Sequence, residues 1–583
     1  MAGLPDAGGT RTARRSSVGV HPDERAAVEE RGTSVRTRVV VVLVVLAVAG
    51  LVLGLSRPWS SRHAGSAVGT SSPSATASRS TSSSPSASSP SAEPTPAVVA
   101  ASAAVRDENA RPGTPGALIP PDRGRAPGLE AYADRVSVLP GESVGLYVST
   151  ETSEPVTARA LRIGYYGGVG QRQVWTGTFT AGPQPAAREI TAPIPDAGGL
   201  VDSRAAYAPW SLSTTVSTRG WPEGAYVIRL DAGAASRYVL LTVRSADAVG
   251  RVLLVNAPMT WQAYNTWGGR GLYGDEGDAF AKRSLAVSFD RPYSDGYGAG
   301  RFFTYDTTVI REGEKLGLPL AWATDYDVAT DPALLDGATA IVFGGHAEYW
   351  TGPMHDAVVQ HVADGANLAV FGANTSYWRV RLAGASTGLE AQPQRRDGRP
   401  RLVVGPKSPS LDPLAVTDPA GATSRFRDNP HPRPEEALTG MRYDCYPAKA
   451  DWVVSDASWW GYAGTGLHDG DRLPDLVGPE SDRVYPSADR PSPMDVVAYT
   501  RLSCGGHETA QTGVYWSNAA GAGVFAAGTM GWRAGADPVG LAVATITDNV
   551  LRAFASPHAG RTSPAVENVD RFWLPAKVTS GSV

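Results

Sequence analysis

A histidine and a glutamate separated by one residue offer the most direct chemistry in this chain. The motif GGHAEYW places His346 and Glu348 two positions apart, so in an extended backbone both side chains project to the same side. An imidazole and a carboxylate held this way can bind one metal ion, orient one another, or act as an acid and base pair. The structural alternative is that Glu348 caps the following helix and His346 is an ordinary loop residue.

Two further clusters combine aromatic rings with amides. In TWQAYNTWGG, Tyr264 lies among Trp261, Asn265 and Trp267, and its phenolate oxygen would be a hard anionic ligand suited to a ferric ion. In FGANTSYWRVR, Asn374 could orient a substrate amide or an attacking water. The structural alternatives are an aromatic side chain packed against the rim of a sheet for Tyr264 and an Asx-turn for Asn374.

The same motifs lack a nucleophile for covalent catalysis. No Cys or Ser occupies the turn in GGHAEYW, and no G-x-S-x-G motif occurs there. The chain has only Cys445 and Cys504, which are too few for a thiolate zinc site, and in an oxidising compartment we interpret them as a mutual disulfide rather than a reactive thiol. A metal-activated water is the natural substitute for a nucleophilic side chain.

Three buried strands must position these clusters. The runs VLLVNA (252–257), TAIVFGG (339–345) and LAVFGAN (368–374) are apolar, and helical periodicity lies between them at 311–318 and 351–367. This alternation predicts a parallel sheet with helices on both faces, of class I amidotransferase-like or flavodoxin-like type. Each cluster follows as a loop at the carboxyl end of a strand, where open parallel sheets bind ligands. We therefore expect the clusters to converge on one site.

The rest of the folded part divides into ranges of contrasting composition. Short β-branched segments separated by Gly and Pro predict an immunoglobulin-like β-sandwich at 126–246. The α/β domain should then span 247–575, and we expect its later part to be a mixed extension that packs onto the sheet. Ser, Thr, Pro and Ala dominate 57–125, which we interpret as a linker because it cannot bury enough apolar surface to offset chain entropy.

One apolar run, Val39–Leu55, is at the short end of what spans a bilayer. Three arginines precede it closely, so the positive-inside rule places a disordered tail, 1–38, in the cytoplasm and exports everything after the run. We predict an uncleaved transmembrane signal anchor at 39–56, with a cleaved signal peptide as the alternative. The formal net charge of −4 gives no basic field for nucleic acid, which we exclude as a partner.

Taken in order, these and other motifs resemble those of the N,N-dimethylformamidase large (beta) subunit family. The similarity covers residues 126–575 and rests on GLEAYADRVSVLPGESV, RIGYYGG, TWQAYNTWGG, TDYDV, GGHAEYW, FGANTSYWRVRL, GTGLHDGDRLPDLVGPESD and GAGVFAAGTMGW. No single motif is specific, but their ordered succession is. The resemblance implies a mononuclear iron (Fe³⁺) bound by two tyrosines and a glutamate, with a histidine, an asparagine and a second glutamate nearby.

The motif positions transfer these roles to this chain. Glu348 matches the ligand glutamate and Tyr264 matches one ligand tyrosine. The resemblance further implies that His346, Asn374 and Glu480 in LVGPESD are the catalytic residues around the metal.

The second ligand tyrosine has a less definite counterpart. We take Tyr226 in EGAYVIRL as the candidate, although it shares a strand face with Ile228 and Leu230. The alternative is a tyrosine of the sandwich core.

From these patterns we expect a membrane-anchored, extracytoplasmic, metal-dependent hydrolase that cleaves the carbon–nitrogen bond of a small amide. The dimethylformamide enzyme of the family is cytoplasmic and works with a small subunit, so the anchor and linker here leave the substrate open. A homo-oligomer is also an open alternative. The competing hypothesis is a non-catalytic cell-envelope protein that binds glycan or a protein partner, which an anchor, a linker and a sandwich would equally suit.

Overall fold

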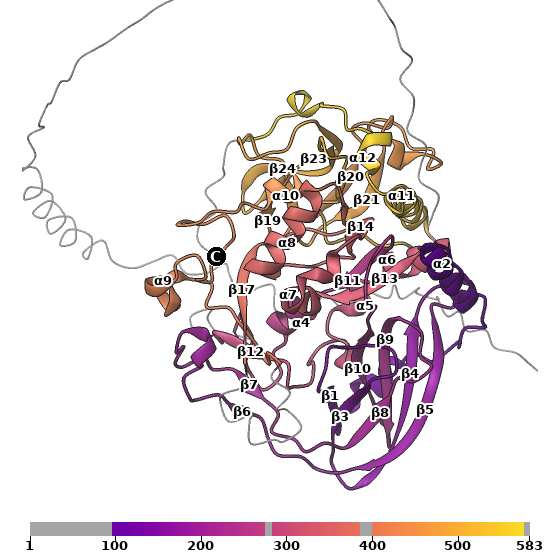
Figure 1. The fold of residues 1–583 in the computed structure, drawn as a ribbon, viewed down its shortest axis with the longest axis vertical. Coiled ribbons are helices and arrows are strands. Elements are labelled where there is room, and N and C mark those ends of the chain that lie inside the picture. The colour runs from indigo at the N-terminus through magenta and orange to yellow at the C-terminus, as the bar shows by residue number, and fades with distance from the viewer. Residues whose placement is uncertain (1–95, 275–282, 385–398, 576–583) are drawn as a thin grey trace, which may run out of the picture. The chain divides into compact units, whose positions relative to one another are not determined.

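The early strands of the chain and the later strands belong to different sheets. The computed structural model describes residues 96–274, 283–384 and 399–575 and sorts their strands into separate sheets. The result is a mixed α/β protein with many sheets and comparatively few helices. Figure 1 shows β1, β3, β4, β5, β8, β9 and β10, in indigo to magenta, grouped together, with the parallel strands β11, β13 and β14 beside them.

The early strands form two facing sheets that share one apolar core. The first has the order β1 (Leu129–Ala133), β3 (Ser143–Thr150), β8 (Thr214–Ser217), and the second has the order β2 (Ser137–Val138), β10 (Ala235–Val243), β9 (Gly224–Ala232), β4 (Glu154–Ile163), β5 (Gln171–Ala181). Leu146 from the first sheet and Ala158 and Ile228 from the second belong to the same buried cluster. The β-rich segment predicted at 126–246 is therefore a two-sheet region, and its immunoglobulin-like topology stays a prediction.

The later strands form one seven-stranded sheet. Its order is β13 (Leu320–Thr324), β11 (Val252–Asn256), β14 (Ala340–Phe343), β16 (Asn367–Val370), β25 (Gly523–Ala526), β24 (His507–Ser517), β23 (Met494–Cys504). The strands from β13 to β25 are parallel, whereas β24 and β23 are antiparallel. Every residue of β11, β13, β14 and β16 is buried, as expected for strands covered on both faces. The C-terminal part thus adds strands to the sheet itself, whereas we expected it to pack onto the sheet.

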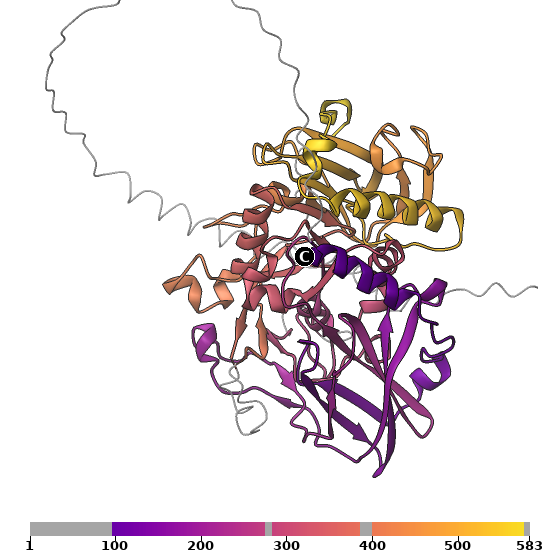
Figure 2. The same cartoon turned by 45° about the vertical axis from the view of Figure 1, so that its right-hand side comes forward.

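Helices cover this sheet in two groups. In the first, α6 (Thr307–Leu316) contacts α11 (Pro538–Phe554), and in the second, α7 (Asp325–Thr330) contacts α8 (Gly352–Ala363). Figure 1 shows β11, β13 and β14 between the two groups. Figure 2 shows α2 (Pro96–Asn109), in indigo, near the yellow α11, and both helices contact α6. The expected arrangement of a parallel sheet between helices is present, and its amidotransferase-like assignment stays a prediction.

Shorter elements connect these layers. One further sheet has the order β12 (Ala286–Ser288), β18 (Leu402–Val404), β17 (Trp378–Ala383), β15 (Tyr349–Thr351). Three two-stranded sheets pair β19 (Arg442–Cys445) with β22 (Ser481–Arg483), β20 (Ala450–Val453) with β21 (Arg472–Val477), and β6 (Arg188–Glu189) with β7 (Ala206–Tyr207). The remaining α-helices of the described residues are α3 (Pro121–Arg125), α4 (Pro258–Tyr264), α5 (Phe302–Tyr305), α9 (Leu414–Thr417), α10 (Glu436–Thr439) and α12 (Ala559–Thr562).

The linker predicted at 57–125 is too long, because the chain is helical from residue 96. In α2 the side chain of Asn109 donates a hydrogen bond to Glu314, and its Oδ1 accepts one from the N–H of Tyr165 at 2.9 Å. Val105, on the same helix, is buried. Composition did not reveal these long-range partners, which stabilise a segment that has little apolar surface of its own.

Two sequence interpretations concern the cysteines and the membrane. Cys445 and Cys504 form a disulfide, as we expected. Within residues 96–274, 283–384 and 399–575, no helix has both the length and the apolar character needed to cross a bilayer. The run Val39–Leu55 lies outside these described residues.

A buried ion pair fastens the two-sheet region to the helices of the α/β part. Arg162 on β4 donates two hydrogen bonds to Glu314 on α6, at 3.0 and 2.5 Å, and the two side chains are 2 % and 0 % exposed. Such a pair is costly to break, because removing one partner leaves the other charge buried without compensation.

We therefore expect Glu314→Ala to lower the free energy of unfolding by about 3–5 kcal/mol. Urea titration followed by tryptophan fluorescence measures this change. The matched control is Glu508→Ala, which breaks the exposed pair between Arg501 and Glu508 and should cost less than about 1 kcal/mol. Equal effects of the two substitutions would contradict a structural role for the buried pair.

Candidate active site

A buried carboxylate beyond the end of β14 is the centre of the candidate site. Glu348 is 1 % exposed, and both of its oxygens accept hydrogen bonds from phenols: Tyr264 donates at 2.7 Å and Tyr273 at 2.8 Å. The two phenolic oxygens are 3.2 Å apart, and the rings stack with their centres at 4.7 Å. Glu348 does not cap α8, because Thr351 accepts the hydrogen bond at that helix start. The structural alternative for Glu348 is therefore wrong.

His346 lies between two carboxylates. Its Nε2 is 3.5 Å from Oε2 of Glu348 and 3.4 Å from Oε2 of Glu480. All three side chains are buried, and among the described residues no hydrogen-bond partner faces Nδ1 of His346. Glu480 directly precedes β22, so the site takes a side chain from a segment more than a hundred residues after His346.

Crowded negative oxygens dominate the electrostatics of this cluster. Burial raises the pKa of Glu348, with Glu480 adding to the increase and His346 opposing it. Burial, followed by the carboxylate of Glu348, raises the pKa values of Tyr264 and Tyr273 well above the ordinary phenol value. Burial lowers the pKa of His346, but the two carboxylates raise it, so the net change is upward. A cation placed here would relieve the repulsion that keeps the oxygens protonated.

Asn374 follows β16 and reaches the same edge of the sheet. It is 3 % exposed and has a φ of 57°, and its backbone N–H donates to both carboxylate oxygens of Asp482, at 2.8 and 3.1 Å. Burial raises the pKa of Asp482 to about 7. The Oδ1 of Asn374 has no hydrogen-bond partner within the part of the chain that the structure describes, so it does not close an Asx-turn. This amide oxygen remains available to a ligand.

Tyr226 is not part of the cluster. Its hydroxyl donates to the carbonyl oxygen of Pro222 at 2.6 Å, and its ring stacks on Trp221 at 5.2 Å. On β9 it faces the core between the two sheets together with Ile228 and Leu230. Our expectation of Tyr226 as the second ligand tyrosine is wrong, because the period-two alternation of the strand turns its side chain into that core.

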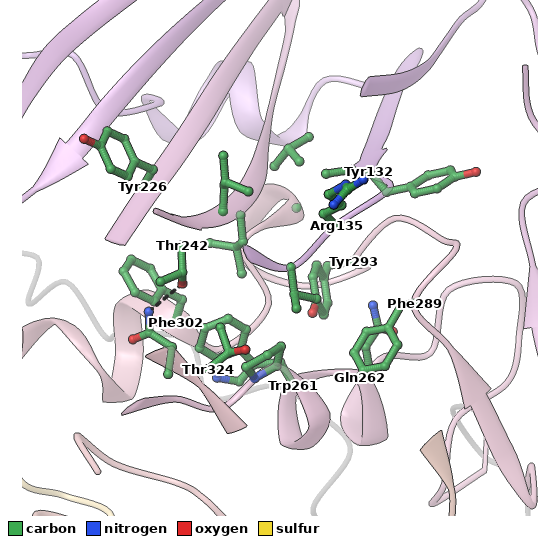
Figure 3. A pocket seen from close by; sticks show the side chains of 18 of the residues that line it. Tyr132, Arg135, Tyr226, Thr242, Trp261, Gln262, Phe289, Tyr293, Phe302 and Thr324 are labelled. Atoms are coloured by element: carbon green, nitrogen blue, oxygen red, sulfur yellow. Dashed lines mark hydrogen bonds between the residues drawn. The ribbon is translucent and has the colours of Figure 1, made fainter. Parts of the chain in front are cut away.

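Tyr226 lines a separate cavity of about 40 Å³ between the two-sheet region and α4. Figure 3 shows Tyr226 at one side of this cavity, with Trp261 and Gln262 of α4 at its lower edge. None of the side chains that contact Glu348 lines the cavity. It is a gap at the junction between the two parts of the fold, distinct from the candidate site.

Tyr273, which our sequence analysis missed, occupies the second phenol position beside Glu348. The segment TWQAYNTWGG is not the loop that we expected: α4 runs to Tyr264, and the chain then turns back so that the N–H of Leu272 donates to Ala263 O at 3.0 Å. This return brings Tyr273 against Tyr264. The only sequence signal was a tyrosine between glycines nine positions after Tyr264, which does not predict the direction of the loop.

A single buried arginine holds that returning loop. The guanidinium of Arg291 donates to four carbonyl oxygens, those of Gln262, Asn265, Trp267 and Arg270, at 2.6 to 3.1 Å. Arg291 is completely buried, and burial lowers its pKa to about 9. Its donors satisfy carbonyls that the end of α4 and the turn after it would leave unpaired.

Two basic side chains cover the phenol rings. Nζ of Lys407 lies 3.3 Å from the ring centre of Tyr273, and Cζ of Arg301 lies 4.1 Å from the ring centre of Tyr264. Burial lowers the pKa of Lys407 well below its ordinary value, with Glu348 opposing the change. Neither residue belongs to a motif that we could recognise, because both reach the site from segments without periodicity.

Glycines allow the strand ends to approach one another. A Cβ on Gly372 would lie 2.0 Å from the carbonyl oxygen of Gly345, and one on Gly345 would lie 2.5 Å from Cβ of Tyr305. Gly345 of GGHAEYW and Gly372 of FGAN are therefore required by close packing. This contact fixes His346 relative to Asn374.

Beneath the strand ends lies a buried acid, Asp306. It is 3 % exposed, and its backbone packs against Gly344. Burial raises its pKa to about 8, partly offset by a hydrogen bond with Trp261.

The described residues contain no group of three or more His, Cys, Asp and Glu side chains arranged to hold a metal ion. The donor set around Glu348 is of another kind, because it has four oxygens: each carboxylate oxygen accepts a hydrogen bond from one phenol, and the two phenol oxygens are within hydrogen-bond reach of each other. Anionic oxygens of this type suit a hard, highly charged cation.

Fold and site together define an α/β protein whose parallel sheet presents buried carboxylates and phenols beyond its strand ends. A family model described as N,N-dimethylformamidase beta subunit-like, C-terminal, matches residues 157–546, which is more than half of the chain. The chain belongs to this N,N-dimethylformamidase beta subunit-like family, and the resemblance found in the sequence is confirmed. Membership suggests a dimethylformamidase-like hydrolase. A search of curated proteins found no match.

The close contact of the strand ends gives a prediction. Gly372→Ala would press a methyl group onto Gly345 O, and we expect it to destabilise the fold by about 1–3 kcal/mol or more. Thermal and urea unfolding measure the loss. Gly182→Ala is the matched control, since its nearest neighbour would be 3.8 Å away. A Gly372→Ala protein as stable as the control would contradict the packing described here.

The raised pKa of Asp306 predicts a dependence of stability on pH. The native state keeps a proton on Asp306 up to about pH 8, whereas the unfolded chain releases it near pH 4, so the free energy of unfolding falls as pH rises between these values. This one group contributes a slope of about −1.4 kcal/mol per pH unit over that window.

Urea titrations at intervals from pH 4 to pH 9 test this dependence. Asp306→Asn cannot release a proton, so the free energy of unfolding of this variant should fall less steeply with pH than that of the wild type. The stability of the variant relative to the wild type should therefore increase with pH across the window. Asp107→Asn, at an exposed position of α2, is the control. Parallel curves for wild type and Asp306→Asn would refute the prediction.

Proposed function

We propose that this protein is a metal-dependent hydrolase that cleaves the carbon–nitrogen bond of a small amide. The observation that carries the proposal is the buried carboxylate of Glu348 with phenols on both of its oxygens and with His346 beside it. A purely structural carboxylate would need neither an acid–base partner nor a position beyond the ends of parallel strands. The family membership supports the reaction class.

We propose Fe³⁺ as the cofactor, held by Tyr264, Tyr273 and Glu348. The donor set fits: two phenol oxygens and two carboxylate oxygens are close together, and a trivalent cation would replace the phenol protons that now join them. When bound, such an ion supplies Lewis-acid polarisation and lowers the pKa of a water molecule.

The neighbouring side chains divide the remaining work. His346 and Glu480, 3.4 Å apart, would accept the proton of the attacking water and return it to the departing amine. Asn374 would orient the amide through its free carboxamide oxygen, held in place by the bond from its backbone to Asp482.

We further propose that the folded part lies outside the cytoplasm and that 39–56 anchors it in the membrane. The disulfide between Cys445 and Cys504 supports an oxidising compartment. The arginines before the apolar run support the orientation.

The metal assignment makes a direct prediction. The full-length protein, purified in detergent, should carry about one iron per chain and a phenolate-to-iron absorption band. Tyr264→Phe and Tyr273→Phe should each weaken the band and lower the rate of amide hydrolysis by about 100-fold. This is the upper end of the loss of metal affinity or activity that follows removal of a supporting group at a metal site. Tyr226→Phe is the matched control and should keep band and rate, because its hydroxyl donates to the carbonyl oxygen of Pro222 and not to Glu348.

Elemental analysis, visible spectroscopy and amine release from an amide panel are the measurements. A folded wild-type protein that binds no metal and releases no amine would refute the hydrolase. That outcome would favour the alternative of a non-catalytic binding protein of the cell envelope.

A further inference from the structure

Arg301 stands beside the candidate site without a carboxylate partner of its own. Its guanidinium lies over the ring of Tyr264, on whose hydroxyl the contact to Glu348 depends. No ion pair joins it to an acidic side chain anywhere in residues 96–274, 283–384 and 399–575. Tyr264, Tyr305, Asp295 and Glu480 act on its charge, and Tyr305 also forms a side-chain hydrogen bond with it.

The backbone around Arg301 is fixed. It directly precedes α5, in which Phe302 is 1 % exposed and packs against Trp261 of α4 with ring centres 5.8 Å apart. Before it, Gly298 approaches the two-sheet region so closely that a Cβ would lie 2.3 Å from Tyr238 O. Arg301 is thus held next to α4, the helix that presents Tyr264.

Arg301 is more exposed than the residues at the centre of the candidate site. Glu348, His346 and Asn374 are buried, whereas Arg301 and Tyr264 are partly exposed. A substrate that reaches Glu348 from the side of Arg301 passes the guanidinium. Its Cζ lies 4.1 Å from the centre of the Tyr264 ring, and a guanidinium can form paired hydrogen bonds with a planar anion.

We propose that Arg301 selects substrates in which the scissile amide carries a carboxylate on its amine side, as in an N-acyl amino acid. This inference rests on the proposed amide hydrolysis and names its substrate class. The guanidinium would bind the carboxylate while the amide carbon faces His346 and Glu480. Water adds to the acyl carbon and gives up a proton, the carbon–nitrogen bond breaks, the nitrogen takes that proton and leaves as an amino acid, and the acyl group is released as a carboxylate.

The test compares two nearly isosteric amides, N-formylglycine and its neutral analogue N-formylglycinamide, on the iron-loaded full-length protein. For the wild type we expect kcat/KM to be at least about tenfold higher for the anion, since a charge-assisted pair distinguishes the two. Arg301→Gln should reduce this ratio to near one, and Arg301→Lys should keep part of it. Arg501→Gln is the matched control, because Arg501 also stacks on an aromatic ring, that of Trp573, and should leave the ratio unchanged.

Binding provides a second readout that does not depend on turnover. Thermal shifts of Glu480→Gln protein with each amide should show stronger stabilisation by N-formylglycine, and the difference should disappear when Arg301→Gln is added. Equal kcat/KM for the two amides, or a ratio that survives Arg301→Gln, overturns the selectivity while amide hydrolysis stands. Selective binding without turnover of either amide supports the role of Arg301 but refutes the hydrolase. Absence of both selective binding and turnover overturns this inference.

Discussion

The site depends on one constraint, that a carboxylate with almost no access to water must be compensated by its neighbours. Removing a carboxylate from water costs several kcal/mol unless hydrogen bonds or opposite charges replace the lost solvation. For Glu348 the replacements are two phenols, an imidazole and a nearby lysine, which come from four separate segments. Burial shifts the pKa values of the phenols and of the lysine, whereas for the imidazole burial is outweighed by the two carboxylates, which raise its pKa. The arrangement is poised to exchange protons for a cation, which is the physical basis of the proposed metal chemistry.

Backbone packing provides the accuracy that this arrangement needs. The ends of β14 and β16 touch through Gly345 and Gly372, so the segments that follow them are placed by main-chain contact rather than by side chains. The loop with the second phenol is held in another way, by the four carbonyls that Arg291 binds. Rigid main-chain supports of this kind keep a site in its working geometry without relying on the ligand.

The two-sheet region and the α/β part are joined through polar groups as well as apolar ones. Arg162 and Glu314 form a buried pair across the junction, and Asn109 of α2 joins the same network. The family match runs from within β4 to within α11 and so includes both sides of this junction. The two parts therefore behave as one structural unit around the site. Gly298 illustrates this connection, because it packs on β10 of the two-sheet region, and Arg301, three residues later, lies over Tyr264 in the site.

The sequence by itself determined the buried strands, because a continuous apolar run such as VLLVNA indicates a strand that is covered on both faces. It placed Tyr264, His346, Glu348 and Asn374 after the ends of such strands. It also identified the family, through the order of its motifs. Only the tertiary structure decided that Tyr273 and not Tyr226 faces Glu348, and that Lys407 and Arg301 cover the phenols. Local periodicity shows which face of a strand a side chain takes. It contains no information about where a loop returns, because that depends on contacts, such as those of Arg291, between residues far apart in the chain.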